Sequence, residues 1–145
     1  MKLYLGQHGE ANPENIDPAR GLTGKGIADT KKVADFSKNI KVDEIWHSTK
    51  LRAKQTAEIF AKVLGKKAIE QEGLRPNDPV SPIVKKIDRD LMVVGHLPFM
   101  EKISSFLITG SEDNRPVIFR QAGIVCLENT NSKWGLSWMV TPEVL

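Results

Sequence analysis

The stretch Leu91-Met92-Val93-Val94-Gly95-His96 decides the fold class. Its apolar residues follow one another without polar alternation, which is typical of a short strand covered on both faces, as in a parallel sheet. Apolar side chains at helical spacing over about residues 99–107, with Gly110 as a stop, predict a helix directly after the strand. A buried strand followed at once by a helix indicates an α/β fold.

The same order of strand and helix is found in the first half of the chain. Residues 2–7 and 43–47 are each typical of a short strand. Thr23 is expected to cap a helix that runs to about Lys38, and a second helix is expected over residues 51–64, where a glycine ends it. Strands and helices therefore alternate in the first half.

The last third of the chain is rich in strand signals. Strands are expected over residues 117–119, 123–127 and 134–139, with turn chemistry in Asn129-Thr130-Asn131-Ser132. Alternating strands and helices with a strand-rich end predict a three-layer α/β/α sandwich on a mostly parallel sheet. With 145 residues and neither a repeat nor a linker, one domain is expected over residues 1–145.

The composition excludes several classes of protein. Hydrophobic residues make up 40% and charged residues 27% of the chain, which excludes disordered, collagen-like and fibrous proteins. No apolar stretch reaches the roughly 18 residues of a membrane span or has the form of a signal peptide, so a cytoplasmic protein is expected. Cys126 is the single cysteine and is interpreted as a small buried hydrophobic residue.

The charge balance is weakly basic. Twenty-one Lys and Arg against eighteen Asp and Glu leave a net charge of +3, which mildly favours an anionic ligand. The lysine pairs at 31–32, 66–67 and 85–86 are spread along the chain and mixed with acids. They are typical of solvated faces, so no nucleic-acid partner is expected.

Chemistry-bearing residues stand where the predicted strands end. His8 follows the first strand, Arg52 opens the helix after the second, and His96 follows the buried strand of the second half. Ligands of a parallel sheet bind beyond the carboxyl ends of its strands, so these side chains are expected to converge on one rim. Gly9 and Gly95 are expected to let the backbone approach a ligand closely.

Two other interpretations of these residues stay open. In the first, each histidine satisfies only a local hydrogen bond, and Arg52 sits at a helix start where the helix dipole disfavours a cation. In the second, His8, His47 and His96 hold a metal, although they are far apart in sequence and lack a local ligand motif. A bound phosphate explains the arginine better, because helix N-termini and guanidinium groups both bind phosphate. His47 is interpreted as structural.

Five motifs resemble those of one family. They are Leu5–Ala11 (LGQHGEA), Arg20–Thr23 (RGLT), Ser48–Ala57 (STKLRAKQTA), Gly95–Pro98 (GHLP) and Trp138–Pro142 (WMVTP). The first, third and fourth are similar to the Arg-His-Gly, Ser-Pro-x-x-Arg-Ala-x-Gln-Thr-Ala and Gly-His-Asn-Pro motifs of the histidine phosphatase (phosphoglycerate mutase-like) superfamily. The other two, with the short length, resemble its small SixA-type phosphohistidine phosphatases.

The resemblance implies a phosphoglycerate mutase-like fold and a two-step phosphoryl transfer. Neutral His8 would attack phosphorus and form a phosphohistidine intermediate that water cleaves. Arg52 and His96 would bind the phosphoryl oxygens, and Arg20 would be a further phosphate contact. The resemblance also implies that neither a metal nor an organic cofactor is required.

The substrate class implied by the resemblance is phosphohistidine on a protein, such as a phosphotransfer domain in bacterial-type signalling. Two alternatives stay open. The first is a phosphomonoesterase for a small phosphorylated metabolite. The second is a catalytically weak module that binds phosphohistidine.

Two features of the chain bear on these alternatives. Gln7 stands where the family motif has an arginine, and it offers phosphate only a neutral amide donor. The lost charge-assisted contact is worth about 1.5–3 kcal/mol unless Arg20 or Lys50 replaces it. A proton donor for an alkoxide leaving group has two candidates, Glu72 and Asp78, each typical of a solvated loop acid.

Overall fold

A six-stranded sheet forms the centre of the computed structural model, which describes all residues 1–145. The strands are β1 Lys2–Gln7, β2 Glu44–His47, β3 Ala68–Glu70, β4 Leu91–Gly95, β5 Ile124–Thr130 and β6 Lys133–Val140. The helices are α1 Gly24–Phe36, α2 Leu51–Leu64, α3 Ser81–Val84 and α4 Phe99–Thr109, with a short 3-10 helix η1 at Pro142–Val144.

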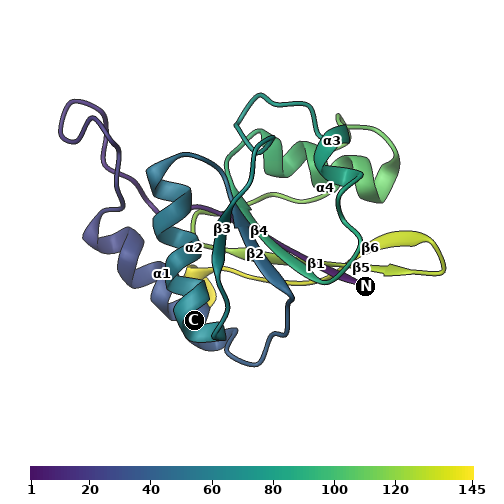
Figure 1. Ribbon diagram of the computed structural model, residues 1–145, viewed down its shortest axis with the longest axis horizontal. Helices are drawn as coiled ribbons and strands as arrows, with labels where there is room; N and C mark the ends of the chain where they lie inside the picture. The colour runs from purple at the N-terminus through teal and green to yellow at the C-terminus, as the bar shows by residue number, and fades with distance from the viewer.

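Helices cover both faces of this sheet (Figure 1). The strand order is β3-β2-β4-β1-β5-β6; the first four strands are parallel, β5 runs antiparallel to β1, and β6 runs antiparallel to β5. α1 and α2 pack into the core on one face, and α3 and α4 pack into the core on the other. The prediction of a three-layer α/β/α sandwich on a mostly parallel sheet is confirmed.

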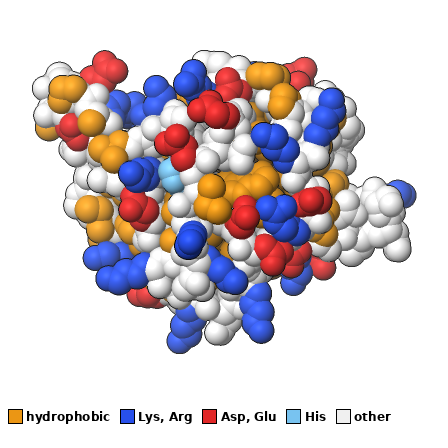
Figure 2. Space-filling model, in the orientation of Figure 1, with side chains coloured by type: hydrophobic (Ala, Val, Ile, Leu, Met, Phe, Trp, Pro, Cys, Tyr) orange, Lys and Arg blue, Asp and Glu red, His pale blue; other side chains and the backbone are white.

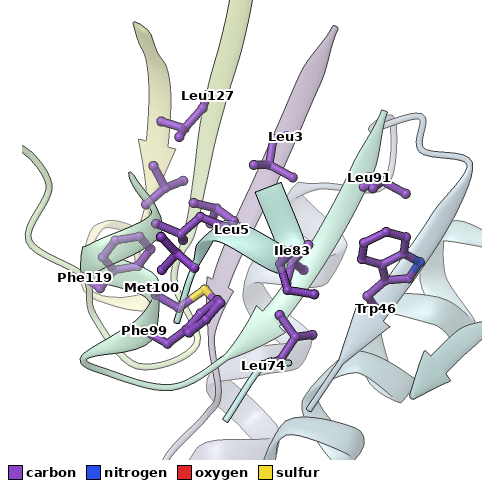
Figure 3. Packing of buried hydrophobic residues seen from close by; sticks show 14 of the residues in the cluster. Leu3, Leu5, Trp46, Leu74, Ile83, Leu91, Phe99, Met100, Phe119 and Leu127 are labelled. Atoms are coloured by element: carbon purple, nitrogen blue, oxygen red, sulfur yellow. The ribbon is translucent and has the colours of Figure 1, made fainter. Parts of the chain in front are cut away.

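β4 contributes to both cores, which explains its unbroken apolar run. Leu91 and Val93 belong to the core under α3 and α4, whereas Met92 and Val94 belong to the core under α1 and α2. All four side chains are fully buried. Figure 3 shows the first of these cores, in which Phe99 and Met100 of α4 lie beside each other and share one cluster with Leu3 and Leu5 of β1. Each strand face therefore has its own apolar partner, as a parallel sheet between helices requires.

One predicted strand is wrong. Residues 117–119 belong to no strand, although Val117 and Phe119 are buried and Ile118 is 51% exposed. Buried and exposed residues alternate here because Val117 and Phe119 pack into the core under α3 and α4. Alternating burial alone does not make a strand, since the backbone here has no paired neighbour.

Other elements differ from the sequence pattern only in detail. β3 and α3 have three and four residues, too few for a periodic signal. The β5–β6 hairpin turns on Asn131 and Ser132, whose φ angles of 53° and 64° suit a two-residue loop, while Asn129 and Thr130 extend β5. Cys126 is buried, as expected. None of the helices is both long and apolar enough to cross a lipid bilayer.

The first turn of α1 packs against the segment that follows β1. Thr23 Oγ1 accepts a hydrogen bond from the Gly26 N–H (2.9 Å) and donates one to Glu10 Oε2 (2.7 Å). A Cβ at Gly26 would lie 2.2 Å from the Glu10 carbonyl oxygen, and a Cβ at Gly9 would lie 2.8 Å from Thr30 Oγ1. Gly9 therefore makes room for α1, which is a different reason from the expected approach of a ligand.

Gly26→Ala is expected to destabilise the protein, because the added methyl group overlaps the backbone of Glu10. Overpacking of this kind lowers the free energy of unfolding by about 1–3 kcal/mol. Gly24→Ala is the control in the same helix, since a Cβ there meets nothing within 4 Å. Its higher helix propensity is expected to add up to about 1 kcal/mol. Urea denaturation measures both values, and equal stability of the two variants would contradict the packing argument.

Candidate active site

The parallel pairing of β1 with β4 brings two histidines together. Gln7 pairs with Gly95, and the next residue on each strand is a histidine. The His8 N–H donates to the Gly95 carbonyl (3.0 Å), and the imidazole centroids of His8 and His96 lie 5.1 Å apart. A Cβ at Gly95 would lie 2.8 Å from Met100 Cε, so this glycine makes room for α4. The predicted convergence of the two histidines is confirmed.

Two arginines join them. Arg52 lies in the first turn of α2, and its buried Nε has no hydrogen-bond partner. Arg20 has a left-handed backbone (φ 53°), and its Nε donates to the Asn12 carbonyl (3.0 Å). Burial lowers the pKa of His8, and the positive charges of Arg52 and Arg20 lower it further. Burial also lowers the pKa of Arg52, and the charge of Arg20 adds to that shift. Both positive charges therefore act on His8.

The motif Arg52-Ala-x-Gln-Thr lies on α2 and contacts the segments that carry His8 and Arg20. Thr56 Oγ1 accepts from the Gly9 N–H (3.0 Å) and donates to the Arg52 carbonyl (2.8 Å), which ties the turn after β1 to α2. Gln55 Oε1 accepts from the Leu22 N–H (2.7 Å) and so anchors the segment that carries Arg20. α2 thus positions both arginines and the first histidine.

The protonation of His8 follows from its contacts. Its Nδ1 lies 2.7 Å from the Gly9 carbonyl oxygen, which can only accept, so Nδ1 carries the hydrogen. In the neutral ring the lone pair is then on Nε2. Burial, followed by the charges of Arg52 and Arg20, lowers the pKa of His8, and the hydrogen bond to Gly9 opposes this shift. A neutral imidazole with a free lone pair is a nucleophile.

His96 is kept neutral even more strongly. Burial, the neighbouring His8, and the positive charges of Arg52, Lys50 and Arg20 lower its pKa to about 3. Its Nε2 lies 2.5 Å from Ser48 Oγ, and its Nδ1 is buried without a partner. At neutral pH the ring is therefore a neutral hydrogen-bonding group.

Unpartnered polar atoms lie near the edge of the sheet where β1 and β4 end. Four buried side-chain nitrogen or oxygen atoms of the protein have no hydrogen-bond partner: Gln7 Oε1, Arg52 Nε, His96 Nδ1 and Ser37 Oγ. Two of the four, Arg52 Nε and His96 Nδ1, belong to residues whose charge or ring lies near His8, and Gln7 Oε1 belongs to the last residue of β1. Such atoms are rare in folded proteins because each costs about 1–3 kcal/mol, and at one site they indicate a place for a polar ligand.

The charge around this edge differs from the charge of the surface as a whole. On the face shown in Figure 2, Lys and Arg side chains are interspersed with Asp and Glu. By contrast, every charged side chain that shifts the pKa of His8 or His96 is a cation. Guanidinium groups and a helix start without an acidic first turn suit an anion, phosphate above all.

No hydrogen bond joins the other candidates to His8 or His96. Glu72 is exposed in a loop, and Asp78 accepts from the Arg75 N–H (2.9 Å), so that it caps a local turn. Neither contributes to the pKa shift of His8. His47 is buried, and its Nδ1 donates to the Ser48 carbonyl (2.8 Å), in agreement with a structural role. No group of three or more His, Cys, Asp or Glu side chains is arranged to hold a metal ion.

Sequence reasoning assigns no role to Ser48, Gln55 or Thr56, although all three lie in the motif that it singles out. The available signal is position: Ser48 is the first residue after β2, and Gln55 and Thr56 lie on the helix that Arg52 opens. Their partners are distant in sequence, so only the fold reveals the contacts.

Solved structures with the same fold include several phosphatases. The protein histidine phosphatase SixA, complexed with tungstate, is 21% identical with a TM-score of 0.87, and the match covers 99% of both chains. A mycobacterial glucosyl-3-phosphoglycerate phosphatase is 15% identical with a TM-score of 0.75, covering 94% of this chain and 97% of that one. A phosphoserine phosphatase mutant from Entamoeba histolytica is 18% identical with a TM-score of 0.72, covering 99% and 98%.

The family is shown by sequence. No curated protein matches the chain in sequence. The family model of the histidine phosphatase superfamily (branch 1) matches residues 3–78, which is more than half of the 145 residues and includes His8 and Arg52. The chain therefore belongs to the histidine phosphatase superfamily.

Proposed function

We propose that this chain hydrolyses phosphohistidine on a protein, with His8 as the nucleophile. The observation that carries the proposal is the pair of buried, unpartnered nitrogen atoms, Arg52 Nε and His96 Nδ1, whose residues both lie near His8. A phosphoryl group beside His8 would give the nitrogen donors acceptor oxygens and neutralise the clustered positive charge. Family membership and the fold shared with SixA support the same reaction.

The first step transfers the phosphoryl group to the protein. The Nε2 lone pair of His8 forms a bond to phosphorus while the bond from phosphorus to the substrate nitrogen breaks. The leaving imidazole takes the electron pair of that bond and a proton from solvent. Arg52 and Arg20 stabilise the charge on the phosphoryl oxygens, and the neutral His96 donates a hydrogen bond to one of them.

The second step regenerates the enzyme. Water attacks phosphorus, the bond to His8 Nε2 breaks, and inorganic phosphate leaves while the imidazole recovers its lone pair. Both steps rely on positioning and positive charge supplied by the protein itself, so the proposed mechanism uses neither a metal nor an organic cofactor.

The surroundings of the histidines favour phosphohistidine over an alkyl phosphate. Imidazole needs much less acid assistance to leave than an alkoxide does. Glu72 is exposed, Asp78 accepts from the Arg75 N–H, and no hydrogen bond joins either carboxylate to His8. A histidine phosphotransfer domain is a partner of this chemistry.

A small-metabolite phosphomonoesterase is the second candidate, favoured by the same fold in the glucosyl-3-phosphoglycerate and phosphoserine phosphatases. That reaction needs a working acid. The double variant Glu72→Gln/Asp78→Asn would then lose turnover of a phosphate ester, whereas the first proposal leaves turnover of phosphohistidine unchanged.

A phosphate adduct on His8 is expected when the chain is mixed with a phosphohistidine protein in the presence of a chelator. Rapid quenching and mass spectrometry detect it, and His8→Ala abolishes both adduct and turnover because Nε2 is lost. Ser104→Ala is the control, since it removes a buried hydroxyl that donates to the Glu101 carbonyl within α4. Turnover that survives His8→Ala, or that is lost with the chelator, would refute the mechanism.

Gln7→Arg is expected to raise kcat/KM by roughly 10- to 100-fold, because a guanidinium adds a charge-assisted contact worth about 1.5–3 kcal/mol to the phosphoryl group. The control is Gln121→Arg, which adds the same charge at the exposed residue that bridges to Gln7. A large gain in kcat/KM for Gln7→Arg but not for Gln121→Arg identifies an enzyme weakened at this position. If the wild-type chain shows no turnover, it is a binding module. If neither variant changes kcat/KM, Arg20 or Lys50 already supplies the contact.

Activity is expected to persist below the ordinary pKa of histidine. The pKa of His8 is lowered from 6.5 by burial and then by Arg52 and Arg20, so the reactive neutral form survives as the pH falls through 6.5. In a profile of kcat/KM against pH, the midpoint of the decline on the acid side should lie below 6.5. In an NMR titration, Arg52→Gln should raise the pKa of His8, while Lys54→Gln on the same helix should leave it in place. A decline of kcat/KM centred above 6.5 would contradict the argument.

A further inference from the structure

A buried serine lies against the imidazole of His96. Ser48 is the first residue after β2, is 1% exposed, and places its Oγ 2.5 Å from His96 Nε2. The backbone N–H of Lys50 donates to the same Oγ across 3.3 Å. These groups form a short hydrogen-bonded chain from the residue that precedes α2 to the second histidine of the site.

The hydrogen atoms shared by Lys50, Ser48 and His96 can be arranged in two ways, and only one of them suits an anion beside His96. A backbone N–H can only donate, so it takes a lone pair of Ser48 Oγ and leaves the hydroxyl hydrogen available to His96 Nε2. A neutral imidazole that accepts at Nε2 carries its own hydrogen on Nδ1. In the reverse arrangement Nε2 donates and Nδ1 bears a lone pair, which repels an anionic oxygen.

His96 Nδ1 is the nitrogen for which this choice matters. It is buried and has no partner within the protein, and its ring lies next to the ring of His8, with 5.1 Å between the centroids. Because burial and the neighbouring charges lower the pKa of His96 to about 3, the ring is neutral at working pH. Its ability to donate toward the reacting edge therefore depends on the tautomer and not on a positive charge.

We propose that Ser48 is a positioning residue, which fixes His96 in the tautomer protonated at Nδ1 so that this N–H donates to the transferring phosphoryl group. The inference rests on the proposed function, in which His96 binds that group. Ser48 itself does not touch the substrate and acts through His96. Partners that fix a histidine in this way around metal ligands are worth about 10- to 100-fold in affinity or activity, and a similar effect is expected here.

The tautomer can be read directly from the wild-type chain by nitrogen NMR of the imidazole rings. His96 is expected to show a protonated Nδ1 and an accepting Nε2, and added inorganic phosphate is expected to shift the Nδ1 signal. In Ser48→Ala the ring is expected to move toward a mixture of tautomers. A wild-type His96 protonated at Nε2 overturns the proposal, and this measurement does not depend on the folding of any variant.

Kinetics provide the second arm of the test. Ser48→Ala is expected to lower kcat by roughly 10- to 100-fold with a smaller change in KM, because the lost donor acts mainly on charge that develops in the transition state. The matched control is Ser104→Ala, which removes a buried hydroxyl that donates to the Glu101 carbonyl within α4. It is expected to leave kcat unchanged.

The outcomes separate the two proposals. A folded Ser48→Ala variant with wild-type kcat and wild-type tautomer overturns the role of Ser48 and leaves the phosphatase intact. A wild-type chain that forms no adduct on His8 and releases no phosphate overturns the proposed function, and with it the role of His96 in catalysis. The NMR result still reports in that case whether Ser48 sets the tautomer.

Discussion

The hydrogen bond from the His8 N–H to the Gly95 carbonyl is the contact on which the site depends. It continues the β1–β4 pairing one residue beyond the strand ends, so His8 and His96 leave the sheet from neighbouring positions. The register of that pairing is set by burial, since alternate residues of β4 fill two different cores. A slip by one residue would exchange the two faces and separate the histidines. Core packing and site geometry are therefore one constraint.

α2 brings positive charge near the two histidines that the β1–β4 pairing places together. Arg52 lies in the first turn of α2, Thr56 Oγ1 accepts from the N–H of Gly9, and Gln55 Oε1 accepts from the N–H of Leu22 in the segment that follows Arg20. Burial and the two arginines then lower the pKa of His8. The same elements that bring these residues together thus also favour the neutral form of His8.

Much of this arrangement is predictable from the sequence. The bounds of α2 follow from apolar periodicity and a terminal glycine, and the convergence of His8, Arg52 and His96 follows from the rule for parallel sheets. The contact of Ser48 with His96 is not predictable, because it joins residues 48 apart through the exact spacing of two strands. The strand wrongly predicted over 117–119 shows the same limit. Alternating burial shows that side chains pack into a core, but it does not show that the backbone pairs with another strand.

The unpartnered atoms at the rim have a consequence for the stability of the whole chain. Buried polar groups without partners oppose folding, and so does a second positive charge that lowers the pKa of the partly buried Arg52; an ordinary core avoids both. In the proposed function this local penalty is the cost of a site that receives an anion, which is a trade-off between function and stability. A bound phosphate would then stabilise the folded chain by giving these groups their missing partners.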